Sequence, residues 1–307
     1  MTIQNTVLIG NGPNRAITKD CFEDGRYEIT WKSLLEKLAA VALVNIRDIE
    51  TKPLTLVFDE ILLRSKVPNV KSLILNQVER ELFYARSSEL SDALNSLSHS
   101  IMTTNYYWPS GSPVSIGRFP DINEKNFSLF RCNTYKGQDL WFINGWVLEP
   151  TSIALGYRQY ARYQAQIKTY LHSGISYSKI KVKNSPLYRG IPILEFEKSE
   201  PYYSWVDVFL RDHIHMIGLG MEYTESILWW LIIEKFALQQ RYPKYIGGIT
   251  YHHVEVKNKP EPNIKNKLNM LEDLGVQVNT VAAANYFDGY LKIADQIKPN
   301  ASKKLKR

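Results

Sequence analysis

The residues with the clearest chemical potential form the segment Gly10-Asn11-Gly12-Pro13-Asn14-Arg15, which follows the apolar run Thr6–Ile9. Glycines after a strand let backbone N–H groups approach a pyrophosphate closely, and an arginine adds charged hydrogen bonds. The dehydrogenase pattern Gly-x-Gly-x-x-Gly is incomplete because position 15 is Arg15, and the lysine of a Walker loop is missing. A phosphate site and a simple tight loop are both open interpretations.

Three further loops share this position after an apolar run, and all are rich in Gly, Asn or Thr. They are Thr104–Tyr107, Asn144–Trp146 and Gly218–Glu225. In a parallel sheet the ligand lies beyond the carboxyl ends of the strands, where the chain leaves for a helix. We therefore expect the four loops to form one site.

The hydrophobic pattern that positions these loops alternates between strand and helix along the chain. It predicts an α/β, Rossmann-like, doubly wound and mostly parallel sheet. We expect strands at 6–9, 100–104, 140–143, 213–217, 245–251 and 276–281, and helices at 33–44, 157–171, 226–238, 263–274 and 284–297. Three other ranges are expected to be a helical insertion or cap (about 50–98), a loop (108–127) and an exposed hairpin or loops (174–200).

Other candidate groups favour structural roles. His213 and His215 alternate along one strand and His252-His253 are adjacent, but a metal would need further converging ligands. Cys21 and Cys132 are interpreted as buried apolar residues, and two cysteines exclude a disulfide framework and a four-cysteine zinc module. The tyrosines of 157–170 fit the core face of a helix better than a base-stacking surface.

Composition and charge are those of an ordinary globular chain: 307 residues, 44% hydrophobic and 22% charged. Five of the net +7 charges lie in the basic tail 298–307, which leaves about +2 for the remainder. Nucleic acid is therefore not an expected partner. The most apolar stretch, Ile214–Ile233, is interrupted by His215, Glu222 and Glu225, so no membrane span is expected. The two cysteines fit a reducing compartment, and the cytoplasm is the expected location.

Taken in order, several short segments resemble the sirtuin-like NAD-consuming fold, in the branch found in bacterial antiphage defence proteins. They are Leu8–Gly12 with Trp31, Thr103–Tyr106, Trp141–Gly145 followed by Pro150–Tyr157, and Ile214–Gly220 with Glu225 and Trp229-Trp230.

This resemblance implies one NAD-binding unit over residues 1–297 and cleavage of the bond between nicotinamide and ribose. By the same resemblance, Asn105 holds the ribose and positions a water molecule, and Asn144 occupies the position of the family's histidine base. NAD is the expected ligand and no metal is expected. The expected ligand-binding residues are Gly10, Asn11, Gly12, Asn14, Thr104, Asn105, Gly218 and Glu225. For Glu225 two interpretations are open: a carboxylate that accepts from a ribose hydroxyl pair, as in dinucleotide-binding folds, and a first-turn acid that complements the helix dipole.

Asn144 departs from the family in a way that affects chemistry, because an amide cannot accept a proton as an imidazole can. Three explanations stay open: an engineered replacement that traps ligand, a natural binder without turnover, and hydrolysis by positioning alone. Tyr107 also stands where the family commonly has an acid. The missing zinc cysteines argue against a protein deacetylase.

Three functional hypotheses follow. The first is an NAD glycohydrolase that acts in antiphage defence by depleting NAD, controlled by self-assembly or by a partner protein. The second is a module that binds NAD or ADP-ribose and signals to a partner. The third is an unrelated nucleotide-binding α/β protein.

Overall fold

The apolar run that precedes the glycine loop becomes the central strand of the sheet. In the computed structural model, β1 (Asn5–Ile9) lies between β2 (Ser100–Thr103) and β8 (His213–Ile217) and is parallel to both. Val7, Leu8 and Ile9 are fully buried because helices cover both faces of this strand. The structure describes residues 3–21, 30–67, 89–98, 100–108, 114–117, 119, 121–124, 126–177, 179–189, 202–257 and 261–298.

Eight strands form the main sheet in the order β10-β9-β8-β1-β2-β5-β4-β3. The remaining five are β3 (Ser115–Ile116), β4 (Asn133–Tyr135), β5 (Gln138–Phe142), β9 (Ile249–Val256) and β10 (Gln277–Ala283). Numbered along the chain, the six parallel strands run 6-5-4-1-2-3, which is the doubly wound order read from one edge. The predicted fold class is confirmed, and the topological switch point lies between β1 and β8.

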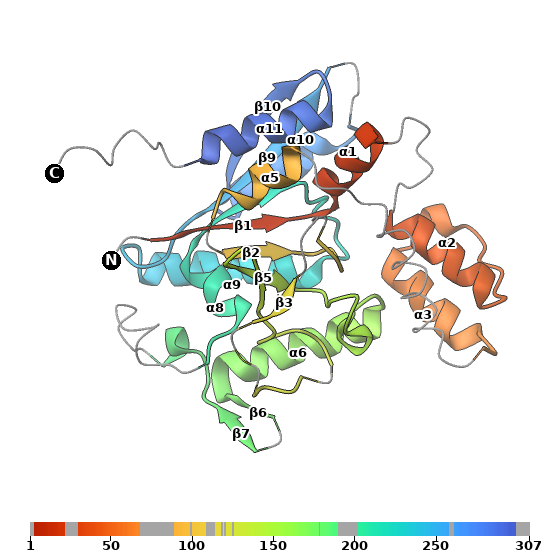
Figure 1. Cartoon of the computed structure of the whole chain (residues 1–307), viewed down its shortest axis with the longest axis horizontal. Helices are drawn as coiled ribbons and strands as arrows, with labels where there is room; N and C mark the ends of the chain where they lie inside the picture. Colours follow the sequence, from red (N-terminus) through yellow and green to blue (C-terminus); the bar gives the residue numbers. More distant parts are fainter. Residues whose placement is uncertain are drawn as a thin grey trace.

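Helices cover both faces of the sheet (Figure 1). One face carries α1 (Asn11–Cys21), α5 (Glu89–Asn95) and α11 (Tyr286–Ile297), and the other carries α6 (Tyr157–Ser173), α8 (Trp205–Arg211), α9 (Ser226–Arg241) and α10 (Ile264–Asp273). Successive residues of β1 alternate between the two cores, with Val7 and Ile9 in one and Leu8 in the other. Within the described ranges no helix has the length and apolar character needed to cross a membrane.

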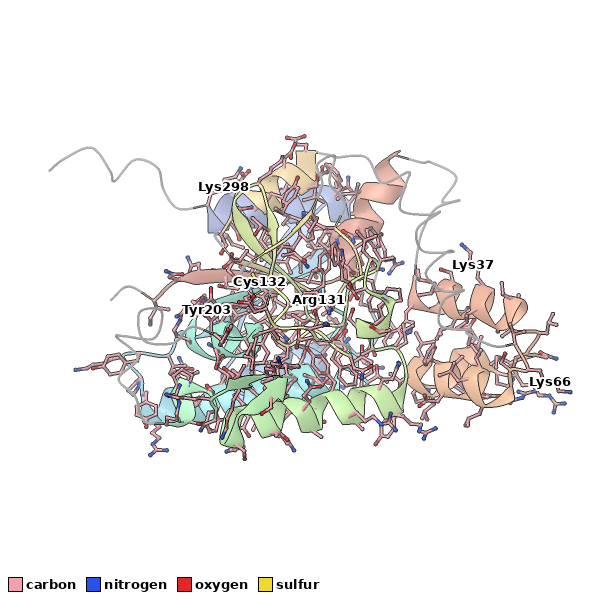
Figure 2. All side chains as sticks on the ribbon, turned by 60° about the horizontal axis from the view of Figure 1, so that its bottom comes forward. Lys37, Lys66, Arg131, Cys132, Tyr203 and Lys298 are labelled. Carbon is pink, nitrogen blue, oxygen red and sulfur yellow. The ribbon has the colours of Figure 1, made fainter. Side chains whose placement is uncertain are left out.

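The pair α2 (Trp31–Val41) and α3 (Leu54–Arg64) stands beyond the carboxyl ends of the strands (Figure 1). Asp59 of α3 anchors the pair to the body, because its carboxylate accepts the Arg158 backbone N–H, 3.1 Å away, at the start of α6. Lys37 and Lys66 project outward from this pair, far from the buried Cys132 (Figure 2).

The expected helical range 50–98 is described only in part, since residues 68–88 lie outside the described residues. Its described helices lie in two places: α3 packs on α2 and α6, whereas α5 packs on α1 and α11. The boundaries of an insertion therefore stay a prediction. In the expected exposed segment 174–200, β6 (Ile175–Tyr177) and β7 (Ile180–Val182) form an antiparallel hairpin, and residues 190–200 lie outside the described residues.

Several local expectations need correction. The segment after β1 is not a loop, because α1 begins at Asn11, directly after Gly10; Pro13 is tolerated there since the first helical turn needs no N–H donor. The range 108–127 contains β3, which joins β4 as an antiparallel edge. Strand β9 starts at Ile249 rather than Tyr245, and α8 was not anticipated.

The tyrosine prediction is confirmed for Tyr160, Tyr163 and Tyr170, which are buried, but Tyr157 is exposed. The side chain of Cys21 and the tail beyond residue 298 lie outside the described part.

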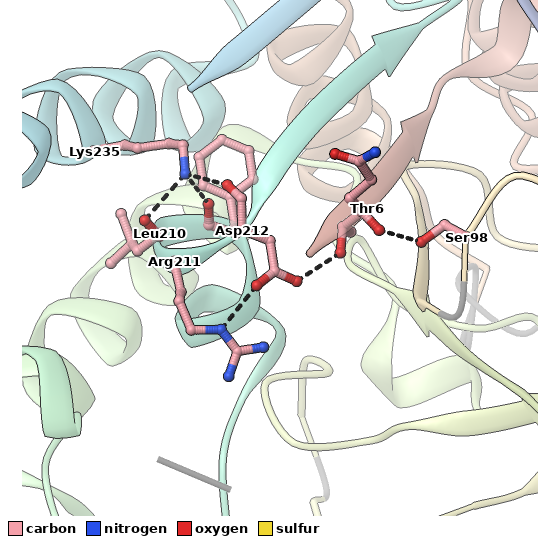
Figure 3. A network of polar contacts seen from close by, with 8 residues as sticks. Thr6, Ser98, Leu210, Arg211, Asp212 and Lys235 are labelled. Atoms are coloured by element: carbon pink, nitrogen blue, oxygen red, sulfur yellow. Dashed lines mark hydrogen bonds and ion pairs between the residues drawn. The ribbon is translucent and has the colours of Figure 1, made fainter. Parts of the chain in front are cut away.

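The buried Lys235 holds together the elements at the amino-terminal ends of β1 and β8, opposite the end where Gly10 lies (Figure 3). Lys235 of α9, 1% exposed, donates to the carbonyl oxygens of Phe209, Leu210 and Asp212 at 2.9, 3.0 and 2.6 Å. The Asp212 carboxylate accepts from Thr6 Oγ1 at 2.8 Å and from Arg211 Nε at 2.8 Å. One ammonium group thus ends α8 and connects it to α9, and Asp212 connects both to β1.

We predict that Lys235→Met lowers the free energy of unfolding by roughly 3 kcal/mol, because three buried carbonyl groups lose their donor. Urea unfolding followed by circular dichroism measures the change. The control is Lys292→Met, which removes a 3.0 Å bond from an exposed lysine to the Ala282 carbonyl and should cost at most about 0.5 kcal/mol. Equal effects of the two substitutions would show that the Lys235 contacts do not stabilise the fold.

Candidate functional site

A single cavity of about 1120 Å³ lies at the carboxyl edge of the sheet. Residues after all six parallel strands contribute to its wall, on both sides of the switch point. They include Gly10–Gly12 after β1, Thr104–Tyr107 after β2, Asn144 after β5, Gly218–Gly220 and Glu225 after β8, Val254 and Val256 at the end of β9 with Glu261 beyond it, and Ala284–Asp288 after β10. The structure therefore brings the four predicted loops together.

The centre of this cavity is shaped by direct contact between the segment Gly10–Gly12, where β1 passes into α1, and the end of β8 with the loop that follows it. The Gly10 N–H donates to the Ile217 carbonyl at 2.9 Å, and the Gly12 N–H donates to the Gly218 carbonyl at 3.0 Å. A Cβ at Gly10 would overlap the Gly218 oxygen, and one at Gly12 would overlap the Tyr290 hydroxyl. Gly218 has φ +66°, and its Cβ would overlap the Pro13 ring. These glycines are required by loop packing, whatever ligand binds.

This packing limits the predicted phosphate contact. Of the five residues Gly10–Asn14, two already donate their N–H, to Ile217 at the end of β8 and to Gly218 after it, and Pro13 has none. Asn14 is 4% exposed and does not line the cavity. Gly10, Asn11, Gly12 and Arg15 do line it, so a phosphate would be held by Arg15 and at most two N–H groups.

Asn105 is held at the junction of β1 and β2. Its Nδ2 donates to the Gly10 carbonyl at 2.9 Å, and its backbone N–H donates to Thr103 Oγ1 at 3.1 Å. Thr104 lies beside it and donates its backbone N–H to the Ile9 carbonyl at 3.1 Å. Asn105 lines the cavity, and its Oδ1 can accept a hydrogen bond from a water or hydroxyl group there.

Asn144 lies on the same side of the cavity, at the end of β5. Its Nδ2 is 3.4 Å from the Thr104 carbonyl, a long hydrogen bond, and its backbone carbonyl accepts from Ala154 at 2.9 Å. Gly145 follows with φ +104° and lies against Ile153. The two predicted catalytic residues therefore line one cavity through neighbouring strands.

Glu225 begins α9 at the N-cap position, but its side chain makes no capping hydrogen bond. Burial, with the charge of Glu222 next, raises the pKa of this carboxyl to about 7, while Lys267 and the Met221 backbone lower it. Its Oε2 is shielded from solvent and has no hydrogen-bond partner among the described residues. The expected ribose contact of Glu225 stays a prediction.

Sequence patterns gave no role to several aromatic residues of the wall. Tyr106 donates its hydroxyl to the Ala154 carbonyl at 3.1 Å and accepts from Tyr160, and burial raises the pKa of both phenols. At the other end, Tyr286 and Tyr290 stack with centroids 6.4 Å apart, and Tyr286 donates to Glu261 at 2.7 Å. Tyr106 lies in the predicted loop Thr104–Tyr107, whereas helical spacing alone cannot separate a core tyrosine from a cavity tyrosine such as Tyr160.

The histidines form a hydrogen-bonded row across β8 and β9. His215 Nδ1 lies 3.0 Å from His252 Nε2, and His252 Nδ1 lies 3.0 Å from the Asn279 amide nitrogen. Since that amide donates, His252 carries its proton on Nε2 and donates it to His215. Among the described residues, no group of three or more His, Cys, Asp or Glu is arranged to hold a metal ion.

Comparison with known proteins gives no relative by which to interpret the cavity: no family model matches the sequence, and no curated protein is significantly similar to it. The cavity is therefore interpreted from its geometry and from the sequence resemblance alone.

The histidine row predicts a specific loss of stability in acid. Burial, and after it the neighbouring histidines, lowers the pKa of His215 to about 3, and burial lowers that of His252 to about 4. Both titrate near 6.5 when unfolded, so the folded state binds fewer protons in acid. The two neutral histidines make their full contribution to the free energy of unfolding above pH 6.5. This contribution is lost as the pH falls toward 3.

Urea unfolding at pH 7.5 and pH 5.0 tests this. The parent chain should lose more stability between these values than the double variant His215→Gln/His252→Gln, whereas His172→Gln, at an exposed position, should keep the parental difference. A double variant with the parental pH dependence would show that the row does not resist protonation.

Proposed function

We propose that the cavity binds NAD and that the chain cleaves the bond between nicotinamide and ribose. The observation that carries the proposal is one cavity that spans the carboxyl ends of all six parallel strands across the switch point. Five strand spacings of about 4.8 Å give a width of roughly 24 Å. A dinucleotide, whose halves lie on either side of a switch point, suits this shape.

The two ends of the cavity differ in chemistry, which orients the proposed ligand. Asn105 and Asn144 line the side of β2 and β5, and Tyr286 and Phe287 line the side of β10. Amide groups suit the hydroxyl groups of the reacting ribose, and aromatic rings suit adenine. We therefore place the nicotinamide riboside at the β2–β5 end and the adenosine at the β9–β10 end.

The proposed reaction breaks the glycosidic C–N bond, and its electron pair leaves with the nicotinamide nitrogen. That nitrogen is cationic in the substrate, so nicotinamide departs neutral and needs no proton. Water then bonds to the ribose carbon and loses a proton to solvent. Asn105 Oδ1 accepts from this water or from a ribose hydroxyl, which lowers the barrier by positioning.

A module that binds NAD or ADP-ribose without fast turnover is the second candidate. Asn144 is the observation that favours it, because its amide cannot take the proton that a histidine base would remove. A role in antiphage defence, and control through self-assembly or a partner protein, rest on the sequence resemblance alone.

The decisive test follows nicotinamide release from NAD. We expect slow release by the parent chain and loss of at least nine-tenths of that rate in Asn105→Ala. Asn144→His should raise the rate by about 10²- to 10⁴-fold, the usual contribution of a general base, with activity rising through pH 6–7. Asn266→Ala, at an exposed position of α10, is the control and should keep the parental rate.

Three results would count against the proposal. Unchanged release by Asn105→Ala would remove Asn105 from the reaction. No gain in an Asn144→His variant that still binds NAD would leave the binding module as the better account. Failure of the parent to bind either NAD or ADP-ribose in calorimetry would contradict both candidates.

A further inference from the structure

One continuous stretch of the chain carries positive charge and no acidic residue. Residues 157–189, which contain α6, β6 and β7, include seven Lys or Arg and no Asp or Glu. The seven cations are Arg158, Arg162, Lys168, Lys179, Lys181, Lys183 and Arg189. Their charge equals the net +7 of the whole chain, so the average charge hides a strongly basic segment.

The outer face of α6 carries the first part of this charge. Arg158 and Arg162 are one turn apart and exposed. Lys168, also exposed, lies at the border with α9, where its Nζ is 5.2 Å from the centre of the Trp230 ring. The opposite face of the helix is buried at helical spacing through Tyr160, Tyr163, Ile167, Tyr170 and Leu171. The helix therefore presents only polar, cationic and small residues to solvent.

The β6–β7 hairpin lies beside α6, along one side of the molecule (Figures 1 and 2). The Tyr177 hydroxyl accepts from Gln166 of α6 at 2.9 Å, and the Ser185 N–H donates to the Tyr170 carbonyl at 3.3 Å. The inner face of the hairpin packs on the core through Ile175, Tyr177, Ile180 and Val182. Alternation along the strands directs the intervening residues to solvent.

These outward residues supply the second part of the charge. Lys181 stands opposite Ser176 in the register of the hairpin, and both side chains are exposed. Lys183 follows two residues later and Lys179 directly precedes β7, and both are exposed as well. Alternate residues of a strand lie about 6.6 Å apart along it. None of the three lysines forms an ion pair among the described residues.

We propose that the outer faces of α6 and the β6–β7 hairpin bind a nucleic-acid duplex through its phosphates. A duplex carries one negative charge per about 1.7 Å of its axis, and neutralising such charges with Lys and Arg gives affinity without sequence recognition. Proteins that prefer single strands add exposed aromatic rings on which bases stack. Within 158–189 no described Phe, Trp or Tyr is exposed. The proposal replaces the expectation drawn from average charge, and it does not depend on the proposed function.

An anionic membrane is the main alternative occupant of a basic surface. Peripheral helices that bind membranes bury an apolar face among the lipids in addition to their charged contacts. The apolar faces of α6 and of the hairpin are already packed on the body of the protein. Charge is therefore the main attraction that this surface offers, which suits phosphates on a duplex better than a lipid bilayer.

The experiment measures fluorescence anisotropy of a labelled DNA duplex of about 20 base pairs with the full chain, between about 50 and 200 mM salt. Lys179→Gln/Lys181→Gln/Lys183→Gln should weaken binding by about tenfold or more. It should also lower the slope of log affinity against log salt by about 2 to 3, because each lost phosphate contact removes about 0.9 from that slope. Arg158→Gln/Arg162→Gln should lower the slope by about 1 to 2.

A second triple variant is the matched control. Lys257→Gln/Lys265→Gln/Lys292→Gln removes the same charge from exposed positions after β9, on α10 and on α11. It should keep the parental affinity within about twofold. The basic tail 298–307 is present in every variant, so its contribution is the same in each.

Four results would overturn the proposal. The parent chain does not bind the duplex, the two triple variants weaken binding equally, or a single strand of the same sequence binds more tightly than the duplex. The fourth result is tighter binding to vesicles that contain phosphatidylserine, lost in the hairpin triple variant, which would assign the surface to a membrane.

Discussion

The close contact between the junction of β1 with α1 and the end of β8 is the constraint on which the rest of the site depends. Two backbone hydrogen bonds join Gly10 to Ile217 and Gly12 to Gly218, and no side chain larger than hydrogen fits at either glycine. This contact sets where α1 begins and where the β8 loop turns toward α9. The cavity opens on both sides of it, which makes a site for a ligand of two halves.

Two buried ionisable groups inside the fold have several hydrogen-bond partners, whereas two buried polar atoms in the cavity wall have none among the described residues. Glu124, 3% exposed, accepts from the backbone N–H groups of Leu129, Phe130 and Arg131. Lys235 likewise uses three carbonyl acceptors. Such groups stabilise a fold only when their partners are complete. Glu225 Oε2 and Trp31 Nε1 depart from this pattern, because both lie in the cavity wall without a hydrogen-bond partner among the described residues.

The sequence predicted the parallel sheet, and the four loops it singled out do meet, because apolar runs that end in Gly or Asn mark the carboxyl ends of buried strands. It could not show that Gly12 faces Tyr290, since that contact joins residues 278 positions apart. The loop expected after β1 was the first turn of a helix, because Gly and Pro at a helix start resemble a turn. Local spacing also could not separate Tyr160, in the cavity wall, from Tyr163 in the core.

Hydrogen exchange of the backbone amides, measured by mass spectrometry with and without saturating ADP-ribose, tests most directly whether one cavity holds a ligand across the switch point. The account predicts protection in the segments after β1, β2, β8, β9 and β10 together, with little change in the β6–β7 hairpin. Protection confined to one side of the switch point, or no protection in any of these segments, would contradict it.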